Sequence, residues 1–426
     1  MHCITNQLKT ITCEIALPSS KSIINRLLVI QHLSHFENYT GLISGSGDIE
    51  TMQLLLNKIK NSNYPGGDPD AITEINVGNA GTVMRFLTAV LAVTPGKWKI
   101  TGSERMQQRP VKPLTDALLT LGAEITFEKT DGYPPILITG NSELKGGVVK
   151  LNSGISSQFI SALMMLGPVL KNGILIEMQG NIISGSYIRM TQALMQKTAA
   201  EVSLNGKLVT VKEGKYSRVD FDSLVEPDWS AAAFWFQVAA FAPETNILLK
   251  GLHRESIQGD SVLPEIYSNL GVKSAFSLNG LLLTKSEKPA CSEFDYDFSD
   301  CPDLAQPVIV TCAALRIKGR FSGLKSLRIK ETDRIEALKV ELQKLGYGIE
   351  VEEDQIVLNG EVVKLQKDQV PVVVNCHDDH RMAMSFAPLA LLNNKICLDD
   401  ADVVKKSYPG FWKDFQLAGF ELSTKL

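Results

Sequence analysis

A design that recurs six times along the chain constrains its fold more than any other feature. Each copy begins with polar or small residues and continues into an apolar segment of helical length. The copies begin near residues 19, 78, 155, 227, 302 and 378. This spacing is close to the roughly 71 residues that each of six equal copies would occupy, and such periods indicate one supersecondary unit used repeatedly. The six segments read SSKSIINRLLVIQHL, GNAGTVMRFLTAVLA, ISSQFISALMMLG, PDWSAAAFWFQVAAF, PDLAQPVIVTCAAL and DDHRMAMSFAPLAL.

Most copies contain a second helical segment, which often ends in Leu-Gly before a strand-like run. Examples are PLTDALLTLGAEITF, VLPEIYSNLGVKSAF and RIEALKVELQKLGYGIEV. The glycine suits a left-handed helix C-cap, and the residues after it alternate as a strand does. Further strand-like runs are GGVVKLN, TNILLKGL and CLDDADVV.

The polarity of the two helices predicts where each lies. The first is apolar nearly all round and should be buried, whereas the second is amphipathic and should lie outside it. This pattern predicts an α/β fold in which sheets enclose helices, with three units closing each of two domains. A division in chain order would fall near Pro227, because proline interrupts a helix.

The composition is that of an ordinary soluble globular protein. Of 426 residues, 44% are hydrophobic and 21% are charged, and the net charge of −4 gives no sign of nucleic-acid binding. Seven scattered cysteines form no CxxC pair, which makes a zinc site unlikely and fits reduced thiols that pack as small apolar side chains. The first residues do not resemble a signal peptide, and no apolar run reaches membrane-spanning length. We therefore expect a cytoplasmic protein.

The helix starts suggest a site for anions. Free N–H groups and the helix dipole attract negative charge there, although capping by Ser, Asp and Asn explains polar residues at any single start. Arginine and lysine, which match phosphate and carboxylate groups, recur near these starts. They are Lys21, Arg26, Arg85, Arg109, Lys330, Arg334, Arg381 and Lys406.

The carboxylates near these cations are fewer, and each has two interpretations. They are Asp228, Asp303, Glu331, Asp333, Asp378 and Asp379. A carboxylate among cations can be an ion-pair partner alone. In KETDR, residues 330–334, two acids and two bases lie within five residues, so Glu331 can also be a positioned proton donor or acceptor.

Other common sites are not supported by the sequence. It contains no P-loop GxxxxGK[ST], no GxGxxG after a strand and no GxSxG elbow. His377 and His380 lie three residues apart beside two aspartates, but no further cluster completes a metal site.

Taken in order, these motifs resemble those of the 5-enolpyruvylshikimate-3-phosphate synthase (3-phosphoshikimate 1-carboxyvinyltransferase) family. The motifs that carry the resemblance are LPSSKSIINR, GNAGTVMR, RPVKPLTDAL, SSQFISALMM, KETDRIEAL, DDHRMAM and KSYP. The resemblance implies an inside-out α/β barrel fold of six βαβαββ units, three per domain. It also implies a discontinuous first domain of residues 1–18 and 228–426, a second domain of residues 19–227, and an active site in the cleft between them.

The implied reaction moves the enolpyruvyl group of phosphoenolpyruvate to the 5-hydroxyl of 3-phosphoshikimate and releases phosphate. It proceeds by addition and elimination through a tetrahedral intermediate, without a metal or organic cofactor. The implied partners are these two small molecules, with no nucleic acid or membrane, and the expected form is a monomer.

The resemblance also implies roles for individual residues. The implied catalytic residues are Asp303, which takes the hydroxyl proton, Glu331, which protonates the methylene carbon, and Lys21, which assists proton transfer. The residues implied to bind phosphoenolpyruvate are Lys21, Gly81, Arg109, Gln158, Arg334, Arg381 and Lys406. Those implied to bind 3-phosphoshikimate are Lys21, Ser22, Arg26, Ser156, Ser157, Gln158, Ser184, Tyr187, Asp303, Ser326 and Lys330. Asn79 and Thr82 are implied to shape the loop at Gly81, and Arg85 is expected to support the helix there.

Five positions depart from the family's common pattern without removing a charged catalytic group. They are Ser19, Ile24, Phe86, Ser186 and Ser326. Phe86 bears on how the helix at Gly81 packs, and the room beside Gly81 leads us to expect sensitivity to glyphosate.

Two rival functions stay open at this stage. An enolpyruvyl transferase acting on UDP-N-acetylglucosamine has Asn after its lysine and a cysteine-bearing loop, whereas here Ser22 follows Lys21 and no cysteine lies between Cys13 and Cys291. The other rival is an anion-binding protein without catalysis, which the presence of Asp303 and Glu331 disfavours.

Overall fold

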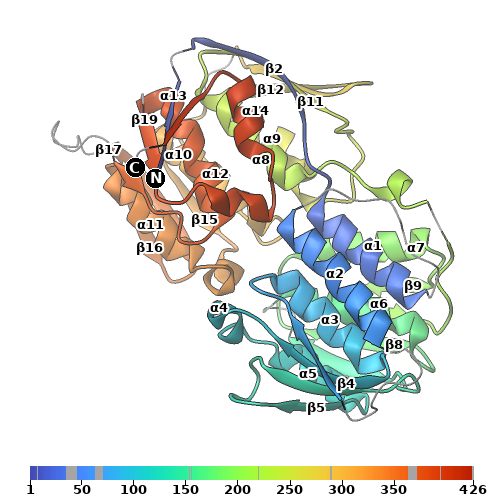
Figure 1. Cartoon of the computed structure of the whole chain (residues 1–426). Helices are drawn as coiled ribbons and strands as arrows, with labels where there is room; N and C mark the ends of the chain where they lie inside the picture. The colour runs from blue at the N-terminus through green and yellow to red at the C-terminus, as the bar shows by residue number, and fades with distance from the viewer. Residues whose placement is uncertain are drawn as a thin grey trace. The chain divides into compact units, whose positions relative to one another are not determined.

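The computed structural model divides the chain into two compact units, each of which is described by itself. Unit 1 contains Met1–Ser20 and Glu226–Leu426, and unit 2 contains Lys21–Val225. The structure describes residues 1–6, 8–34, 46–62, 71–152, 154, 156–218, 220–287, 290–362, 372–393 and 395–424. Within these ranges the strands form five four-stranded sheets, and no helix is long and apolar enough to cross a membrane. The fold is of the α/β class, with several separate sheets and many helices (Figure 1).

Unit 2 contains seven helices and eight strands in its described residues. The helices are α1 (Lys21–Leu33), α2 (Gly47–Ser62), α3 (Gly81–Val93), α4 (Glu104–Gln107), α5 (Lys112–Thr120), α6 (Ser157–Leu166) and α7 (Gly185–Lys197). The strands are β3 (Ile72–Asn76), β4 (Gly96–Thr101), β5 (Glu124–Phe127), β6 (Ile136–Gly140), β7 (Val148–Asn152), β8 (Ile174–Gln179), β9 (Val202–Asn205) and β10 (Leu208–Val211).

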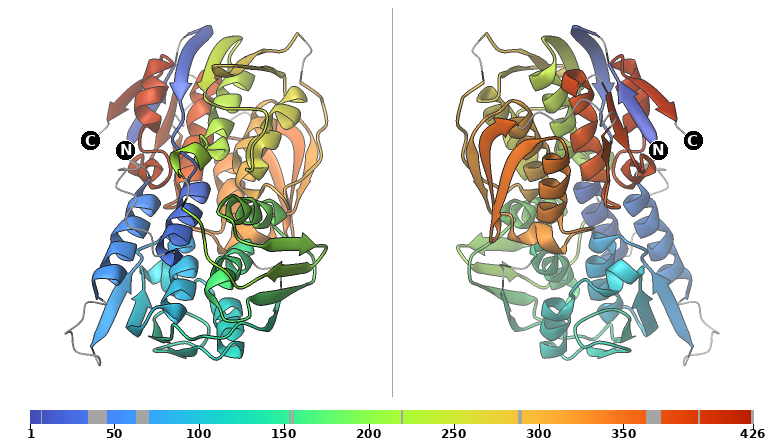
Figure 2. Two further views of the ribbon diagram at one scale, coloured as in Figure 1. Left: turned by 90° about the vertical axis from the view of Figure 1, so that its right-hand side faces the viewer. Right: turned by 90° about the vertical axis from the view of Figure 1, so that its left-hand side faces the viewer.

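The helices of unit 2 pack on one another and are flanked by its sheets. Helix α3 contacts α1, α5 and α6, and α6 contacts α7. The sheet β3-β4-β6-β5 packs against α3, and the sheet β7-β8-β10-β9 packs against α6. Figure 2 shows these helices between β3, in light blue on one side, and the green strands of the sheet β7-β8-β10-β9 on the other.

Unit 1 contains the remaining elements. Its helices are α8 (Trp229–Phe241), α9 (Leu263–Ser268), α10 (Ala305–Ala314), α11 (Arg334–Lys344), α12 (His380–Phe386), α13 (Ala390–Asn393) and α14 (Phe411–Leu417). Its short 3-10 turns include η3 (Gly259–Val262), η4 (Pro302–Leu304), η5 (Lys325–Ile329) and η7 (Asp402–Lys406). Its strands are β1 (His2–Thr5), β2 (Thr10–Ala16), β11 (Glu244–Lys250), β12 (Val272–Ser277), β13 (Gly280–Lys285), β14 (Tyr296–Asp297), β15 (Gly319–Ser322), β16 (Tyr347–Glu352), β17 (Gln355–Val362), β18 (Val373–Val374), β19 (Lys395–Leu398) and β20 (Glu421–Thr424).

The first residues of the chain complete two sheets of unit 1. Strand β1 lies between β19 and β20 and is antiparallel to both, so the two ends of the chain lie side by side (Figure 1). Strand β2 pairs in parallel with β11 at the edge of the sheet β12-β13-β11-β2. Ile4, Ile11 and Ile15 of these two strands join the hydrophobic core that α8, α10 and α12 share.

The six apolar segments of the sequence all form helices. They are α1, α3, α6, α8, α10 and α12, and burial follows their composition: in α8 every residue except Ser230 is buried, and in α12 every residue is. The three Leu-Gly sequences end helices as predicted, because Gly122, Gly271 and Gly346 have φ angles of 92°, 86° and 85°. The strand-like run CLDDADVV, residues 397–404, belongs to β19 only in its first two residues, and its last three residues belong to η7.

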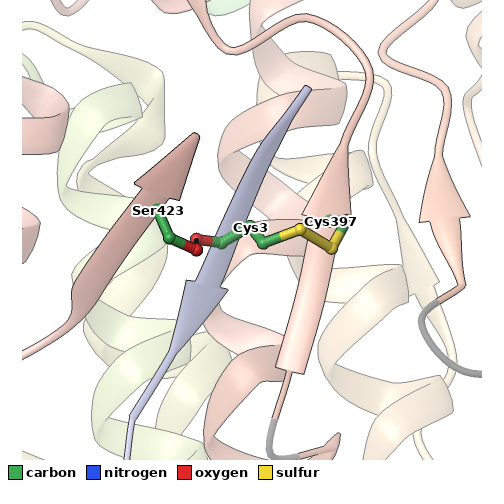
Figure 3. The surroundings of a disulfide bond; sticks show 3 residues. All are labelled: Cys3, Cys397 and Ser423. Carbon is green, nitrogen blue, oxygen red and sulfur yellow. Dashed lines mark hydrogen bonds between the residues drawn. A yellow bond between two sulfur atoms is a disulfide. The ribbon is translucent and has the colours of Figure 1, made fainter. Parts of the chain in front are cut away.

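The prediction of reduced thiols is wrong for two of the seven cysteines. Cys3 and Cys397 face each other across β1 and β19, and a disulfide joins them (Figure 3). They are 394 residues apart in sequence, so only the register of the two strands brings them together. The other five cysteines are free, and three of them, Cys301, Cys312 and Cys376, are buried.

The disulfide gives a prediction about stability. Cys3→Ser should lower the free energy of unfolding by about 2–4 kcal/mol, because the bond restricts the unfolded chain over a long loop. Urea denaturation without reductant measures the change, and reducing the wild type should cause a similar loss. Cys291→Ser, which removes a free and partly exposed cysteine, is the matched control. Equal stability of wild type and Cys3→Ser would show that the bond does not form.

Candidate active site

At the start of α1, Lys21 is held by a carboxylate from α2. Its Nζ lies 3.0 Å from Oδ2 of Asp48, and both side chains are largely buried. Asp48 lies in the first turn of α2, where a negative charge interacts favourably with the helix dipole. The ion pair therefore fixes a cation beside the starts of two helices.

Arg26, one turn further along α1, is buried among the helices of unit 2. It donates to the hydroxyls of Thr191 and Ser161 and to the Ser22 carbonyl. Its guanidinium lies 5.4 Å from the ring centre of Phe86. Burial lowers the pKa of Arg26 to about 10. The bonds to Ser161 and Thr191 thus join α1 to α6 and α7.

At the start of α3, the backbone of Gly81 lies against the side chain of Arg109. A Cβ at Gly81 would be 2.5 Å from Nη2 of Arg109, which is closer than real Cβ contacts. Arg85 donates from Nη1 to the Gly81 carbonyl and from Nη2 to the Pro110 carbonyl. This pairing supports the helix, as the sequence predicts, and also holds the segment that carries Arg109.

The starts of α3 and α6 are joined by side chains. Gln158 donates from Nε2 to the Thr82 hydroxyl over 3.1 Å, and its own N–H donates to the hydroxyl of the capping residue Ser156. Ser157, the next residue, is buried. Of the predicted loop residues, Thr82 therefore contacts Gln158.

The start of α7 contains two further predicted residues. Ser184 is buried and has a φ of 59°, an uncommon left-handed conformation for a residue other than glycine. Its carbonyl accepts a hydrogen bond from the Tyr187 N–H. The Tyr187 carbonyl accepts from Thr191, which also binds Arg26. Thr191 therefore links the first turn of α7 to the guanidinium of Arg26.

In unit 1, the buried guanidinium of Arg334 joins three carboxylates. Its Nε lies 2.7 Å from Asp379, its Nη1 lies 3.2 Å from Asp303, and its Nη2 lies 3.1 Å from Glu331. Only 2% of the Arg334 side chain is exposed. Burial acts to lower its pKa, but Asp379, Glu331 and Asp303 together raise it. The guanidinium is therefore charged, and its fork fixes the two acids that the sequence predicts to be catalytic.

Two further cations contact the same acids. Lys406 Nζ lies 2.6 Å from Glu331, and Arg381 Nη2 lies 3.0 Å from Asp303. Asp379 caps α12 by accepting from the Arg381 N–H. Asp303, Glu331, Arg334, Arg381 and Lys406 thus form one cluster, in which cations alternate with acids.

Two further predicted residues of unit 1, Ser326 and Lys330, lie near this cluster in sequence. Ser326 is buried in η5, and no hydrogen-bond partner is found for its hydroxyl in the described residues. Lys330 follows η5 in extended conformation. Asp333, the other acid of KETDR, is a helix cap that accepts from two backbone N–H groups of α11 and pairs with Arg328. The ion-pair interpretation therefore holds for Asp333, and its role as a helix cap was not predicted.

The sequence did not identify several residues that organise these clusters. Asp48 is 27 residues from Lys21, and Asp379, noted only as a nearby carboxylate, is 45 residues from Arg334. No motif spacing connects partners so far apart. A capping aspartate before an Arg-containing helix was the one available signal for Asp379.

Comparison with known proteins finds one consistent family. The family model described as EPSP synthase (3-phosphoshikimate 1-carboxyvinyltransferase) matches residues 5–415. A protein of Bacteroides fragilis named 3-phosphoshikimate 1-carboxyvinyltransferase is 44% identical over 412 residues, which cover 96% of each chain. One of the same name from Methanospirillum hungatei is 33% identical over 418 residues, or 94% of each chain. The solved structure of EPSP synthase from Acinetobacter baumannii matches with a TM-score of 0.73 and 20% identity over 99% of each chain, which supports the fold.

The close approach at Gly81 gives a prediction about packing. Gly81→Ala should lower the free energy of unfolding by about 1 kcal/mol, because the added methyl overlaps the end of the buried Arg109 side chain, which has to move. In a double-mutant cycle with Arg109→Ala, the two losses should not add, because the shortened side chain relieves the overlap. Urea denaturation measures all four proteins.

Gly214→Ala is the matched control, since a Cβ there meets nothing within 4 Å. If Gly81→Ala and Gly214→Ala are equally stable, or if the cycle is additive, Arg109 does not occupy the space beside Gly81.

Proposed function

The chain belongs to the EPSP synthase (3-phosphoshikimate 1-carboxyvinyltransferase) family, and we propose that two groups of residues carry out this family's reaction together. They are the Arg334 cluster of unit 1 and the charged residues Lys21, Arg26 and Arg109 of unit 2. The reaction transfers the enolpyruvyl group of phosphoenolpyruvate to the 5-hydroxyl of 3-phosphoshikimate and releases phosphate, a step of aromatic amino-acid biosynthesis. The observation that carries the proposal is the cluster at Arg334, where two acids and three cations lie within ion-pair distance.

The reaction requires two protons to move and two anions to be held. In the addition step, the 5-hydroxyl oxygen bonds to C2 of phosphoenolpyruvate, its proton leaves, and C3 gains a proton. In the elimination step, the C2–O bond to phosphate breaks and C3 loses a proton. We assign Asp303 as the base for the hydroxyl, Glu331 as the acid at C3, and Lys21 as an aid to proton transfer.

The cations of unit 1 have a second role in this proposal. Arg334, Arg381 and Lys406 hold the phosphate and carboxylate groups of phosphoenolpyruvate, which such cations match well. In the structure, Lys406 and Arg381 pair with Glu331 and Asp303. An arriving anion competes for these cations and leaves the two acids freer to exchange protons.

Unit 2 supplies the remaining binding residues. For phosphoenolpyruvate they are Lys21, Gly81, Arg109 and Gln158. For 3-phosphoshikimate they are Lys21, Ser22, Arg26, Ser156, Ser157, Gln158, Ser184 and Tyr187, together with Asp303, Ser326 and Lys330 of unit 1. Starts of α1, α3, α6 and α7 carry most of these residues, where N–H groups and helix dipoles favour anions. Holding both substrates together makes their reaction effectively unimolecular.

The finer description of the fold belongs to the same proposal. We propose that the two units are enolpyruvyl transferase domains, each an inside-out barrel of three βαβαββ units, and that both domains contribute to one active site. The protein acts as a monomer in the cytoplasm, without a metal or organic cofactor.

Two rival functions differ from this proposal in whether phosphate is released and with which acceptor. A UDP-N-acetylglucosamine enolpyruvyl transferase would use a different acceptor, but Ser22 follows Lys21 here and the cysteine of its loop has no counterpart between Cys13 and Cys291. A non-catalytic binder would release no phosphate at all.

Phosphate release therefore tests the function. The protein should release phosphate from phosphoenolpyruvate only when 3-phosphoshikimate is present, and not when UDP-N-acetylglucosamine replaces it. A colorimetric phosphate assay with each acceptor measures this. Release that depends on the nucleotide sugar, or binding of both substrates without release, would overturn the proposal.

The expected sensitivity to glyphosate was based on room beside Gly81, but the Arg109 guanidinium lies against that glycine in the structure. Competition between glyphosate and phosphoenolpyruvate in the same assay would support the expectation, and no competition at millimolar inhibitor would contradict it.

A further inference from the structure

Asp260 is a buried carboxylate to which the proposed function gives no role. It lies in η3, between β11 and α9, and only 4% of its surface is exposed. Its Oδ2 accepts a hydrogen bond from the hydroxyl of Ser230 on α8. In the described part of the chain, no lysine or arginine lies within ion-pair distance of it. An ionised carboxyl group is unfavourable in such surroundings unless it is compensated.

The surroundings of Asp260 place it beside the proposed base. Helix α8 contacts both η3, which carries Asp260, and η4, which carries Asp303. The titratable and charged groups that interact electrostatically with Asp260 are Asp303 from η4, Arg381 from α12, Asp228 from the cap of α8, and the Cys301 thiol that precedes η4. The turns that carry the two acids, η3 and η4, thus both pack against α8.

These neighbours act on the proton of Asp260 in opposite directions. Burial raises the pKa of Asp260 most, and the charges of Asp303 and Asp228 raise it further. The Ser230 hydrogen bond and Arg381 lower it. The interaction between two charges is mutual, so a negative charge on Asp260 also favours a proton on Asp303.

Asp303 is otherwise surrounded in a way that weakens it as a base. Arg334 and Arg381 lie 3.2 and 3.0 Å from its two carboxylate oxygens. Both cations favour the ionised carboxylate and oppose the uptake of a proton. Removal of a hydroxyl proton goes faster with a base of higher proton affinity, so a second negative charge nearby would offset the arginines.

We propose that Asp260 is a positioning residue for proton transfer: when its carboxyl group is ionised, the negative charge keeps Asp303 basic enough to accept the proton of the substrate hydroxyl. The inference rests on the proposed function, because it requires Asp303 to be the base. Ser230 belongs to the same arrangement, since its hydrogen bond favours the ionised form of Asp260. Asp260 itself touches neither substrate.

Asp260→Asn tests the inference, because it keeps the shape of the side chain and removes the charge. The expected result is a kcat roughly tenfold lower above neutral pH, where Asp260 of the wild type is ionised. The acid limb of the kcat profile should move to lower pH, because Asp303 then loses its proton more readily. The KM for phosphoenolpyruvate should change less than kcat. Steady-state kinetics across the pH range measure all three quantities.

Ser230→Ala gives a second and different expected profile. Without the Ser230 hydroxyl, Asp260 is harder to ionise. The kcat of Ser230→Ala should therefore be low near neutral pH and return toward the wild-type value at higher pH. The kcat of Asp260→Asn should stay low at both. Ser261→Ala is the matched control, because Ser261 lies in η3 beside Asp260 but donates its hydrogen bond to the Gln258 carbonyl. Its pH profile should be that of the wild type.

Stability separates this role from a purely structural one. The raised pKa means that the folded protein holds this proton more tightly than the unfolded chain does. The free energy of unfolding therefore falls as pH rises from the ordinary range of a carboxyl group through the raised pKa. Asp260→Asn removes that fall, so the variant should be at least as stable as the wild type at alkaline pH while turning over more slowly.

The opposite results would overturn the inference. A residue that only holds η3 in place would lose stability and turnover together in Asp260→Asn, with an unchanged pH profile in both Asp260→Asn and Ser230→Ala. Asp303→Asn separates this failure from that of the proposed function. If Asp303→Asn is inactive and the Asp260→Asn profile is unchanged, only the inference fails; if Asp303→Asn stays active, the proposed base is wrong.

Discussion

The buried guanidinium of Arg334 is the interaction on which the rest of the unit 1 site depends. It forms ion pairs with Asp379 at the cap of α12, Asp303 in η4 and Glu331 before α11. One positive charge thus holds together three segments that are far apart in sequence. A planar fork with five donors can satisfy several carboxylates at once, which lysine cannot do. Removing such a cation would leave buried carboxylates without compensation, which is among the costliest changes in a protein.

Unit 2 uses a buried arginine in a comparable way. Arg26 fixes α1 against α6 and α7 through Thr191 and Ser161, and Arg85 fixes the start of α3 to the segment of Arg109. The six helices formed by the apolar segments are largely buried, and many of the predicted site residues lie at or near their starts. The same sequence pattern that builds the core therefore leaves the chemistry at one end of each helix.

The sequence predicts local features well because they depend on neighbouring residues. The apolar helices and the left-handed glycines at Gly122, Gly271 and Gly346 follow from periodicity and from conformational freedom. The partners Asp48 and Asp379 do not, because tertiary packing alone brings them to Lys21 and Arg334. The Cys3–Cys397 disulfide was missed for the same reason. The six-unit barrel, the domain boundaries and the substrate-binding roles of single residues stay predictions.

The central claim is that Asp303 and Glu331 are held by cations for proton transfer and not for stability. Calorimetric binding and single-turnover measurements on Asp303→Asn and Glu331→Gln test it most directly, because each amide keeps the size of the side chain and removes its ability to exchange protons. The account predicts that both substrates still bind within a few-fold of the wild-type affinity, while the rate of transfer falls at least about 100-fold. Loss of binding in proportion to the loss of rate would contradict it and make the two acids structural ion-pair partners.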